Sequence, residues 1–298
     1  MIIHSTPVNW TEYELVDTGN FLKLERFGKY YLVRPEPQAV WDTSMSEAEW
    51  NNMSHAVYTR RKGNTNLASG DERGEWALKP DMPSQWIIEY RFEEMKLKFR
   101  LGLTAFKHVG IFPEQAVNWV YLYDFIRKRK GKEIKFLNLF AYTGGASLAA
   151  CSAGAIVTHL DSVKQVVGWA RENMELSGLS DIRWIIDDAV KFVKREIRRG
   201  NKYQIILLDP PAYGRGPEGE KWILQTGINE MIKDCNELLQ DTDSCFILNM
   251  YSVGFSPLIG ESIVQTVFGK VNGEMQEFYL EDRAGRKIPM GVVFSFER

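Results

Sequence analysis

The sequence predicts an α/β protein in which a smaller β-rich region precedes a mostly parallel sheet covered by helices on both faces. Two observations predict this class. Short, continuously apolar runs alternate with helix-like segments from about residue 113 onward, and short strand-like runs separated by glycine turns come before them. Continuously apolar strands are typical of parallel sheets buried on both faces. We therefore expect a β-rich domain at 1–110, possible substrate-binding in role, and an α/β domain at 111–298.

The N-terminal region contains five expected strands and many tryptophans. Five of the nine tryptophans lie here, and we expect them to fill a small core, with a stacking surface for bases as the alternative. The polar, glycine-rich segment 59–75 predicts a mobile loop with a cationic start at residues 60–62. The expected strands are Tyr13–Val16, Phe21–Phe27, Tyr30–Val33, Trp86–Phe92 and Met95–Leu101.

The C-terminal region alternates strands and helices. A helix over 113–130 begins with proline and ends in the basic RKRKGK, which suits the negative end of a helix dipole. The strands expected after it are Lys135–Phe140, Ala155–Leu160, Ile182–Ile186, Ile205–Leu208 and Cys245–Met250, and the helices are Ala146–Ser152, Val163–Ser177, Ala189–Arg199 and Lys221–Leu239. The runs Glu274–Leu280 and Met290–Phe296 predict a hairpin at one sheet edge, which makes a seven-stranded sheet.

The composition bounds the cellular setting. The chain has 298 residues, 44% of them hydrophobic, and a net charge of −2. Its three cysteines form no CxxC pattern, so we expect a reduced compartment with neither disulfides nor a zinc site. No apolar run approaches the roughly 18 residues of a membrane span. We expect a soluble cytoplasmic protein without metal, either monomer or homodimer.

The loop after the first α/β strand reads FAYTGGASLAA. Gly144 and Gly145 allow positive φ and close approach of a ligand to backbone amides, and Thr143 is placed to cap the next helix. The dinucleotide pattern GxGxxG is absent, so a diphosphate is not the expected ligand.

Acids follow the next three strands. Asp161, Asp188 and Asp209 each stand at or just after a strand end, and such ends meet at one edge of a doubly wound sheet. A single aspartate at this place is most often a helix N-cap. Together, the acids suit a ligand with several donors and a positive centre. S-adenosylmethionine has ribose hydroxyls, an adenine amine, an ammonium and a sulfonium.

Four segments resemble a known family. FLNLFAYTGGASLA, THLDSVKQVVGWARENMELSGL, DDAVKFVKRE and ILLDPPAYGRG resemble motifs of class I S-adenosylmethionine-dependent methyltransferases. More narrowly, they resemble the ribosomal RNA large-subunit methyltransferases that modify cytosine C5 or guanine N7 of 23S RNA. The resemblance covers about residue 106 to the C-terminus. GIFPEQAVNW is similar to the FxDQRxNR segment of those enzymes, except that Ala116 and Trp119 replace its two arginines.

The resemblance implies a Rossmann-like fold and a cofactor site. Residues 142–145 would hold the methionine end, Asp161 the ribose, and Asp188 with Ala189 the adenine. Asp209 would face the methionine ammonium or the incoming substrate. The full expected cofactor-binding set is Phe140, Tyr142, Thr143, Gly144, Gly145, Asp161, Ser162, Asp188, Ala189 and Asp209.

Two prolines follow Asp209 directly. Proline fixes φ, so Pro210 and Pro211 give this backbone a set direction, and we expect their carbonyls to be free acceptors for a base edge. Tyr213 is placed to stack on a flipped base. The segment 214–222 predicts a mobile loop that closes over the substrate, with Arg215 near phosphate or simply in solvent. The expected catalytic residues are Asp209, Pro210, Pro211 and Tyr213.

The cysteines bear on the target atom. Methylation of a pyrimidine C5 needs a thiolate that attacks C6, and in the resembled family that cysteine follows the fifth strand. Here ILNMYSVGFS stands in that place, with Cys245 at the wrong end of the strand and Cys151 and Cys235 in helices. We therefore expect a nitrogen nucleophile. His159 is expected to be packed and His108 to lie at the cleft rim, neither of them a base.

RNA, specifically ribosomal RNA, is the expected partner. Basic clusters at 60–62, 127–132 and 194–199 could line an RNA path, or be helix ends and solvated faces, as we favour for the second. The alternatives are a methyltransferase of a small molecule or protein, a catalytically silent RNA-binding protein, and a dehydrogenase. The missing GxGxxG and the DPP motif disfavour the last.

Overall fold

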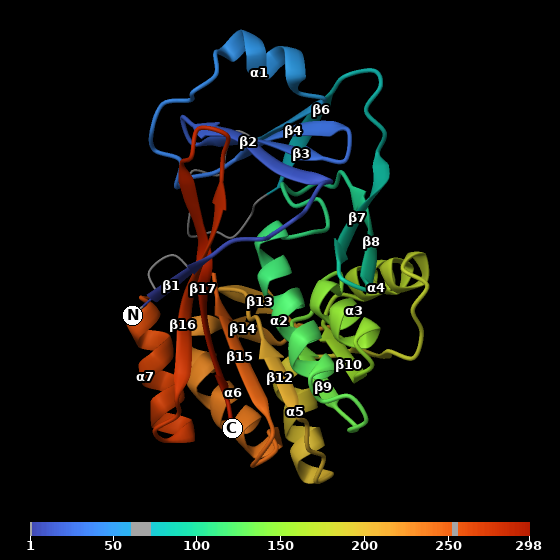
Figure 1. The fold of residues 1–298 in the computed structure, drawn as a ribbon, viewed down its shortest axis with the longest axis vertical. Coiled ribbons are helices and arrows are strands. Elements are labelled where there is room, and N and C mark those ends of the chain that lie inside the picture. The colour runs from blue at the N-terminus through green and yellow to red at the C-terminus, as the bar shows by residue number, and fades with distance from the viewer. Residues whose placement is uncertain (1, 61–72, 252–255) are drawn as a thin grey trace. The chain divides into compact units, whose positions relative to one another are not determined.

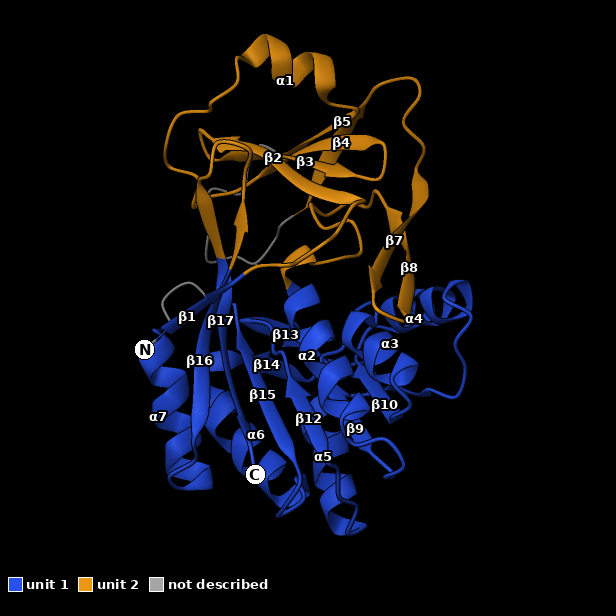
Figure 2. Ribbon diagram, viewed as in Figure 1, with its two compact units in different colours: residues 1–5, 115–278, 290–298 blue, residues 6–114, 279–289 orange. Residues whose placement is uncertain are grey.

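The structure is a computed structural model that describes residues 2–60, 73–251 and 256–298. The chain forms two compact units (Figure 2). Unit 1 comprises residues 1–5, 115–278 and 290–298, and unit 2 comprises residues 6–114 and 279–289. Each unit is therefore assembled from segments that are distant in the sequence.

A large sheet forms the centre of unit 1 (Figure 1). Among the described residues it has eight strands in the order β1-β16-β17-β15-β12-β9-β10-β11. Neighbours from β15 to β11 run parallel, and β17 pairs antiparallel with β15. The strands are β1 Ile2–Ser5, β9 Lys135–Leu139, β10 Ile156–Asp161, β11 Arg183–Ile186, β12 Ile205–Leu208, β15 Cys245–Met250, β16 Gly273–Glu281 and β17 Lys287–Glu297.

Helices cover this sheet in two groups (Figure 1). The helices α2, α3 and α4 contact one another in sequence, and α5, α6 and α7 form a second contacting series. In the part of the chain that the structure describes, no helix is long and apolar enough to cross a membrane. The helices are α2 Ala116–Arg127, α3 Gly145–Ser152, α4 Lys164–Leu176, α5 Ala189–Arg198, α6 Leu224–Leu238 and α7 Pro257–Phe268.

The predicted α/β class is confirmed, with one more strand in the sheet than the seven expected. The additional strand is β1, which pairs in parallel with β16 from Ile2 opposite Met275 to Ser5 opposite Phe278. The predicted hairpin of β16 and β17 therefore does not form the edge, because β1 lies beyond it. The two isoleucines at 2 and 3 are a strand signal that the sequence interpretation passed over.

The segment after Asp209 is a short hairpin where the sequence predicted a loop and the start of a helix. Strands β13 (Tyr213–Arg215) and β14 (Lys221–Ile223) pair antiparallel, with Gly214 opposite Trp222. Helix α6 consequently begins at Leu224 and not at Lys221. Trp222 is buried, and its indole packs at 5.1 Å from the ring of Phe140. Burial of this one aromatic side chain explains why the segment folds back on the sheet.

Unit 2 contains a five-stranded sheet in the order β2-β3-β4-β5-β6, the hairpin β7-β8 and helix α1. Trp10 and Trp50 are buried, which confirms the core interpretation for these two, while Trp41, Trp76 and Trp86 are half-buried. The ends of segment 59–75 belong to strands β5 and β6, and residues 61–72 lie outside the described residues. The elements are β2 Tyr13–Gly19, β3 Leu22–Phe27, β4 Tyr30–Pro35, α1 Glu47–Met53, β5 Ala56–Arg60, β6 Gly74–Leu78, β7 Gln85–Phe92 and β8 Met95–Gly102.

Candidate cofactor and substrate site

Strand register brings the predicted site residues to one edge of the large sheet. Leu139 of β9 is opposite Leu160 of β10 and Leu208 of β12, and Leu208 is opposite Leu248 of β15. The next residue on each strand therefore lies in one row. That row contains Asn249, Asp209, Phe140 and Asp161. It crosses the point between β9 and β12 where the strand order reverses, which is the place where doubly wound sheets bind ligands.

The loop after β9 has an unusual backbone. Phe140 has a φ of 58° and Tyr142 a φ of 50°, so two large side chains adopt the left-handed conformation. Gly144 has a φ of 91°, as the sequence predicted for this glycine. A non-glycine residue at positive φ costs of order 1–3 kcal/mol and is concentrated at ligand sites. The surrounding contacts hold this loop in a shape that its own residues disfavour.

Helix α3 begins without a side-chain cap. Its N-cap is Gly144, and no side chain among the described residues accepts a hydrogen bond from its first turn. The predicted cap by Thr143 is therefore wrong: Thr143 is buried, and its carbonyl accepts a hydrogen bond from Asn173 Nδ2 at 3.0 Å. The first N–H groups of a helix need an acceptor. Here they are left for an anionic group of a ligand.

Gly145 is the point of closest packing between α3 and α2. A Cβ atom at Gly145 would lie 2.5 Å from the ring of Trp119, which is buried. Trp119 is one of the two residues that replace the arginines of the resembled FxDQRxNR segment. A bulky aromatic ring thus supports the glycine loop, and only glycine fits against it.

Asp161 is held by backbone amides. Its Oδ2 accepts a hydrogen bond from Tyr142 N at 2.9 Å, and its Oδ1 accepts one from Val163 N at 3.0 Å. Burial raises the pKa of Asp161, and these amide hydrogen bonds oppose the rise. The neighbouring Ser162 donates its Oγ hydrogen to the carbonyl of Arg215 at 2.9 Å. The carboxylate therefore has a fixed direction and acceptor capacity to spare.

The acid pair after β11 has structural partners. Asp188 is the N-cap of α5, and its Oδ1 accepts a hydrogen bond from Lys191 N at 2.9 Å. Asp187 forms an ion pair with Arg195. Ala189 is buried at the start of α5. The N-cap interpretation is confirmed for Asp188, whose second carboxylate oxygen could still contact a ligand.

Asp209 has the most perturbed carboxyl group of this row. It directly follows β12 and is half-buried. Burial raises the pKa of Asp209 to about 6, and a hydrogen bond from Asn249 opposes the rise. A strongly shifted acid at a ligand-binding edge is a functional candidate on physical grounds.

Three side-chain amides connect Asp209 to α2. Asn249 Oδ1 accepts a hydrogen bond from Asn118 Nδ2 at 3.0 Å. Gln115 Oε1 accepts hydrogen bonds from both Asn118 Nδ2, at 2.9 Å, and Asn249 Nδ2, at 3.0 Å. We call Gln115, Asn118 and Asn249 the amide triad. The sequence interpretation gave these residues no role, although Gln115 and Asn118 match the glutamine and asparagine of the FxDQRxNR segment.

The two prolines differ in what their carbonyls do. The Pro211 carbonyl accepts a hydrogen bond from Trp222 Nε1 at 2.7 Å, so the expectation of two free acceptors is wrong for Pro211. No donor to the Pro210 carbonyl is found within residues 2–60, 73–251 and 256–298. Tyr213 is 48% exposed on β13. Pro210 and Tyr213 remain available to a substrate, while Pro211 fastens the hairpin.

The cysteines lie away from this edge and hold their protons. Cys245 stands at the other end of β15, where burial raises its pKa to about 12. Burial also raises the pKa of Cys151 and Cys235. The thiolate is the nucleophilic form of cysteine, so none of the three is prepared for covalent catalysis.

Cys245→Ser is expected to leave the rate of methyl transfer within about twofold of the parent, because the thiol is remote from the ligand edge. The measurement is single-turnover transfer with the substrate that proves active, beside thermal unfolding of the same protein. A variant that folds normally but transfers nothing would revive a thiolate mechanism.

His159 is packed, as expected. It is fully buried on β10, its Nδ1 is 3.0 Å from Ser147 Oγ, and its ring lies 4.7 Å from that of Trp184. Burial lowers its pKa to about 3, so it stays neutral and cannot serve as a base that cycles its proton near pH 7. His108 belongs to unit 2, where its ring contacts Phe112 at 5.0 Å.

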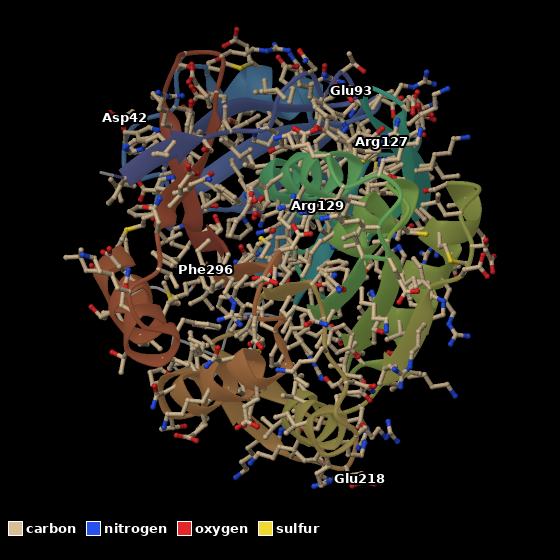
Figure 3. All side chains as sticks on the ribbon, turned by 60° about the horizontal axis from the view of Figure 1, so that its bottom comes forward. Asp42, Glu93, Arg127, Arg129, Glu218 and Phe296 are labelled. Atoms are coloured by element: carbon tan, nitrogen blue, oxygen red, sulfur yellow. The ribbon has the colours of Figure 1, made fainter. Side chains whose placement is uncertain are left out.

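The basic clusters are largely ion-paired where they are described. At the end of α2, Arg129 pairs with Asp243 at 2.7 Å and with Glu297 at 3.2 Å, which supports the structural interpretation of residues 127–132 (Figure 3). In the cluster 194–199, Arg195 and Arg199 pair with acids. Of the third cluster only Arg60 is described. The predicted RNA path therefore remains a prediction.

Acidic partners also surround the hairpin turn. Lys191 on α5 pairs with Glu218 at 2.8 Å and with Glu220, and Glu218 lies at the rim of the molecule in Figure 3. Arg215 is exposed on β13. Within the described residues, no cluster of three or more histidine, cysteine or acidic side chains could hold a metal ion.

Comparison with known proteins agrees with this geometry. A family model described as S-adenosylmethionine-dependent methyltransferase matches residues 70–264. The crystal structure of a SAM-dependent methyltransferase from Agrobacterium tumefaciens is 35% identical and superimposes with a TM-score of 0.89, covering 100% of this chain and 93% of that one. The resemblance drawn from the four sequence motifs is confirmed.

Curated relatives match part of the chain. The ribosomal RNA large subunit methyltransferase K/L of Shewanella frigidimarina is 34% identical over 54% of this chain and 22% of its own length. The protein of the same name from Pseudoalteromonas translucida is 32% identical over 41% of this chain and 16% of its own length. This chain thus spans about a fifth of the length of those relatives.

Proposed function

The chain belongs to the S-adenosylmethionine-dependent methyltransferases, and from this membership we propose that it methylates a base nitrogen of ribosomal RNA without a catalytic cysteine. One observation carries the choice of nitrogen: Asp209 and the Pro210 carbonyl stand at the ligand edge, while every thiol lies elsewhere and is protonated. The relatives named for ribosomal RNA support the choice of RNA.

The residues at the edge fit the family's cofactor. The uncapped first turn of α3 suits the methionine carboxylate, because its N–H groups lack a side-chain acceptor among the described residues. Asp161 has the direction and the acceptor sites for two ribose hydroxyls. Phe140, Tyr142 and Ser162 lie in the adjoining loops, and Asp188 with Ala189 would border the adenine. S-adenosylmethionine, when bound here, supplies an electrophilic methyl group on its sulfonium.

The substrate residues act by positioning. The target nitrogen supplies the lone pair that forms the new bond to carbon while the carbon–sulfur bond breaks, so alignment accounts for most of the rate. Asp209 and the Pro210 carbonyl would accept hydrogens from the reacting edge, and Tyr213 would stack on the base. A proton displaced from an exocyclic amine can pass to Asp209, whose pKa of about 6 suits this transfer.

Asp161→Ala is expected to weaken S-adenosylmethionine binding by at least about tenfold, because a charge-assisted hydrogen bond contributes roughly 1.5–3 kcal/mol. Isothermal titration of both proteins measures it. Asp241→Ala is the matched control, since the Asp241 side chain is 92% exposed. Equal affinity of the Asp161 variant and the parent would contradict the ribose assignment.

The proposed function is tested with labelled S-adenosylmethionine and unmodified ribosomal RNA made by transcription. We expect label in the RNA, and nuclease digestion followed by mass spectrometry to place the methyl group on a base nitrogen. Protein extract and RNA-free metabolite extract are parallel substrates. Label only in one of those would make this a protein or small-molecule methyltransferase. RNA binding without transfer would make it a silent RNA-binding protein, and methyl on C5 would refute the nitrogen target.

Two further expectations depend on this function. A cytoplasmic location follows from ribosomal RNA as substrate, and the oligomeric state, monomer or homodimer, stays a prediction. Sedimentation measures the second.

A further inference from the structure

The amide triad reaches the ligand edge from two distant parts of the chain. Asn249 follows Leu248 at the end of β15, whereas Gln115 and Asn118 lie at the start of α2. Asn118 and Asn249 are 3% and 2% exposed, so their amides are nearly excluded from water. A buried amide is costly unless its donors and acceptors are paired. The triad pairs them with one another and, through Asn249, with Asp209.

The triad also decides which end of the Asn249 amide faces Asp209. The Asn249 oxygen already accepts a hydrogen bond from Asn118, and the Asn249 nitrogen donates to Gln115 and to Asp209. Turning this amide over would place its oxygen against the Asp209 carboxylate and its nitrogen against the Asn118 donor. Both contacts would be repulsive, so a single orientation is stable.

We propose that Asn249 is a positioning residue, which aims the Asp209 carboxylate at the ligand and keeps it ionised, and that Gln115 and Asn118 hold Asn249 in the donor orientation. The identity of the ligand that Asp209 receives rests on the proposed function. The triad occupies one acceptor position of the carboxylate, and the remaining positions can receive hydrogens of the substrate or the ammonium of the cofactor.

No charged group competes with the triad at this carboxylate. Burial and the Asn249 hydrogen bond account for the pKa of Asp209, and no charged side chain on β9, β12, β15 or α2 contributes to it among the residues that the structure describes. The hydrogen bond from Asn249 is thus the one interaction of a described side chain that stabilises the ionised form against burial. Its removal should be visible in the titration of Asp209 itself.

The experiment compares Asn249→Leu and Gln115→Met with Asn236→Leu, a matched control on α6. Each protein is labelled with ¹³C at the aspartate carboxyl, and the Asp209 signal, assigned with Asp209→Asn, is followed by NMR from pH 4 to pH 9. In the parent, Asp209 is expected to titrate near pH 6. In Asn249→Leu its acid dissociation constant should fall by roughly tenfold, as for loss of one hydrogen bond to a charged group.

Gln115→Met is expected to move the titration in the same direction by a smaller amount, although Gln115 has no bond to Asp209. It is half-buried and methionine is nearly isosteric, so this variant also serves if Asn249→Leu does not fold. Unchanged titration of Asp209 in a folded variant would overturn the inference. S-adenosylmethionine titration of the same proteins separates the two proposals, because a parent that binds no cofactor would refute the function while leaving the measured shift in place.

Discussion

Asp209→Asn is expected to lower methyl transfer by roughly 10²–10³-fold, the loss typical of removing one positioned polar group from an active site. The asparagine has nearly the same shape, and its oxygen can still accept the hydrogen bond from Asn249. It cannot, however, carry the negative charge or receive a proton. Single-turnover transfer to the active RNA, with S-adenosylmethionine affinity measured in parallel, shows whether the loss falls on chemistry or on cofactor binding.

The same substitution should stabilise the fold at neutral pH. The pKa of Asp209 rises on folding from 3.8 to about 6, so the folded protein binds more protons than the unfolded chain between these values. Its free energy of unfolding therefore falls as the pH rises through this window. Asp209→Asn removes that penalty and should be more stable by roughly 1–3 kcal/mol above pH 7.

Urea unfolding at several pH values measures this difference. The advantage of the variant should shrink as the pH falls below 6 and vanish near pH 4. An equal advantage at all pH values would show that packing, and not ionisation, is responsible. Full activity in Asp209→Asn would remove Asp209 from the proposed site altogether.

Gly145→Ala is expected to destabilise unit 1 by about 2–3 kcal/mol and to weaken S-adenosylmethionine binding at least tenfold, since overpacking costs about 1–3 kcal/mol. The new Cβ would lie 2.5 Å from the ring of Trp119. Either α3 or the indole must move, and α3 carries the uncapped amides proposed to hold the cofactor. Urea unfolding and isothermal titration measure the two effects.

The chain offers a matched control and a rescue. Gly168 lies within α4, where an added Cβ would meet no other described atom within 4 Å, so Gly168→Ala should be neutral or stabilising by up to about 1 kcal/mol. Trp119→Leu in the Gly145→Ala background should recover part of the lost stability, since the leucine frees the space of the ring. Strict additivity of the two changes would show that Gly145 and Trp119 do not interact.

Periodic features of the chain were accessible from the sequence. The strand at 205–208 and that at 245–250 agree with the structure residue for residue, because continuous apolar runs between polar boundaries leave little choice of ends. The row of acids followed from the same pattern, since parallel strands place their ends together. The positive φ of Gly144 was expected for the same loop.

Features that depend on distant partners were not accessible. Nothing local in Asn249 or Gln115 announces that β15 and α2 bring them together. The strand at 221–223 has helix-compatible residues, and only the burial of Trp222 makes it fold back. The cap expected from Thr143 failed because its neighbour Gly144 takes the left-handed conformation and places the start of α3 beyond its reach. In each case, tertiary packing outweighed local preference.

The place of β17 in the large sheet sets the order in which the chain can be completed. This strand (Lys287–Glu297) stands between β15 and β16, and β1 joins only to β16 among the described strands. Strand β1 leaves the ribosome long before β16 and must therefore wait for it before it finds its place. Unit 2 also waits, because its residues 279–289 are made after most of unit 1. Pairings of such long sequence separation fold slowly, and a nascent chain shortened before β17 would expose the edges of β15 and β1 to aggregation.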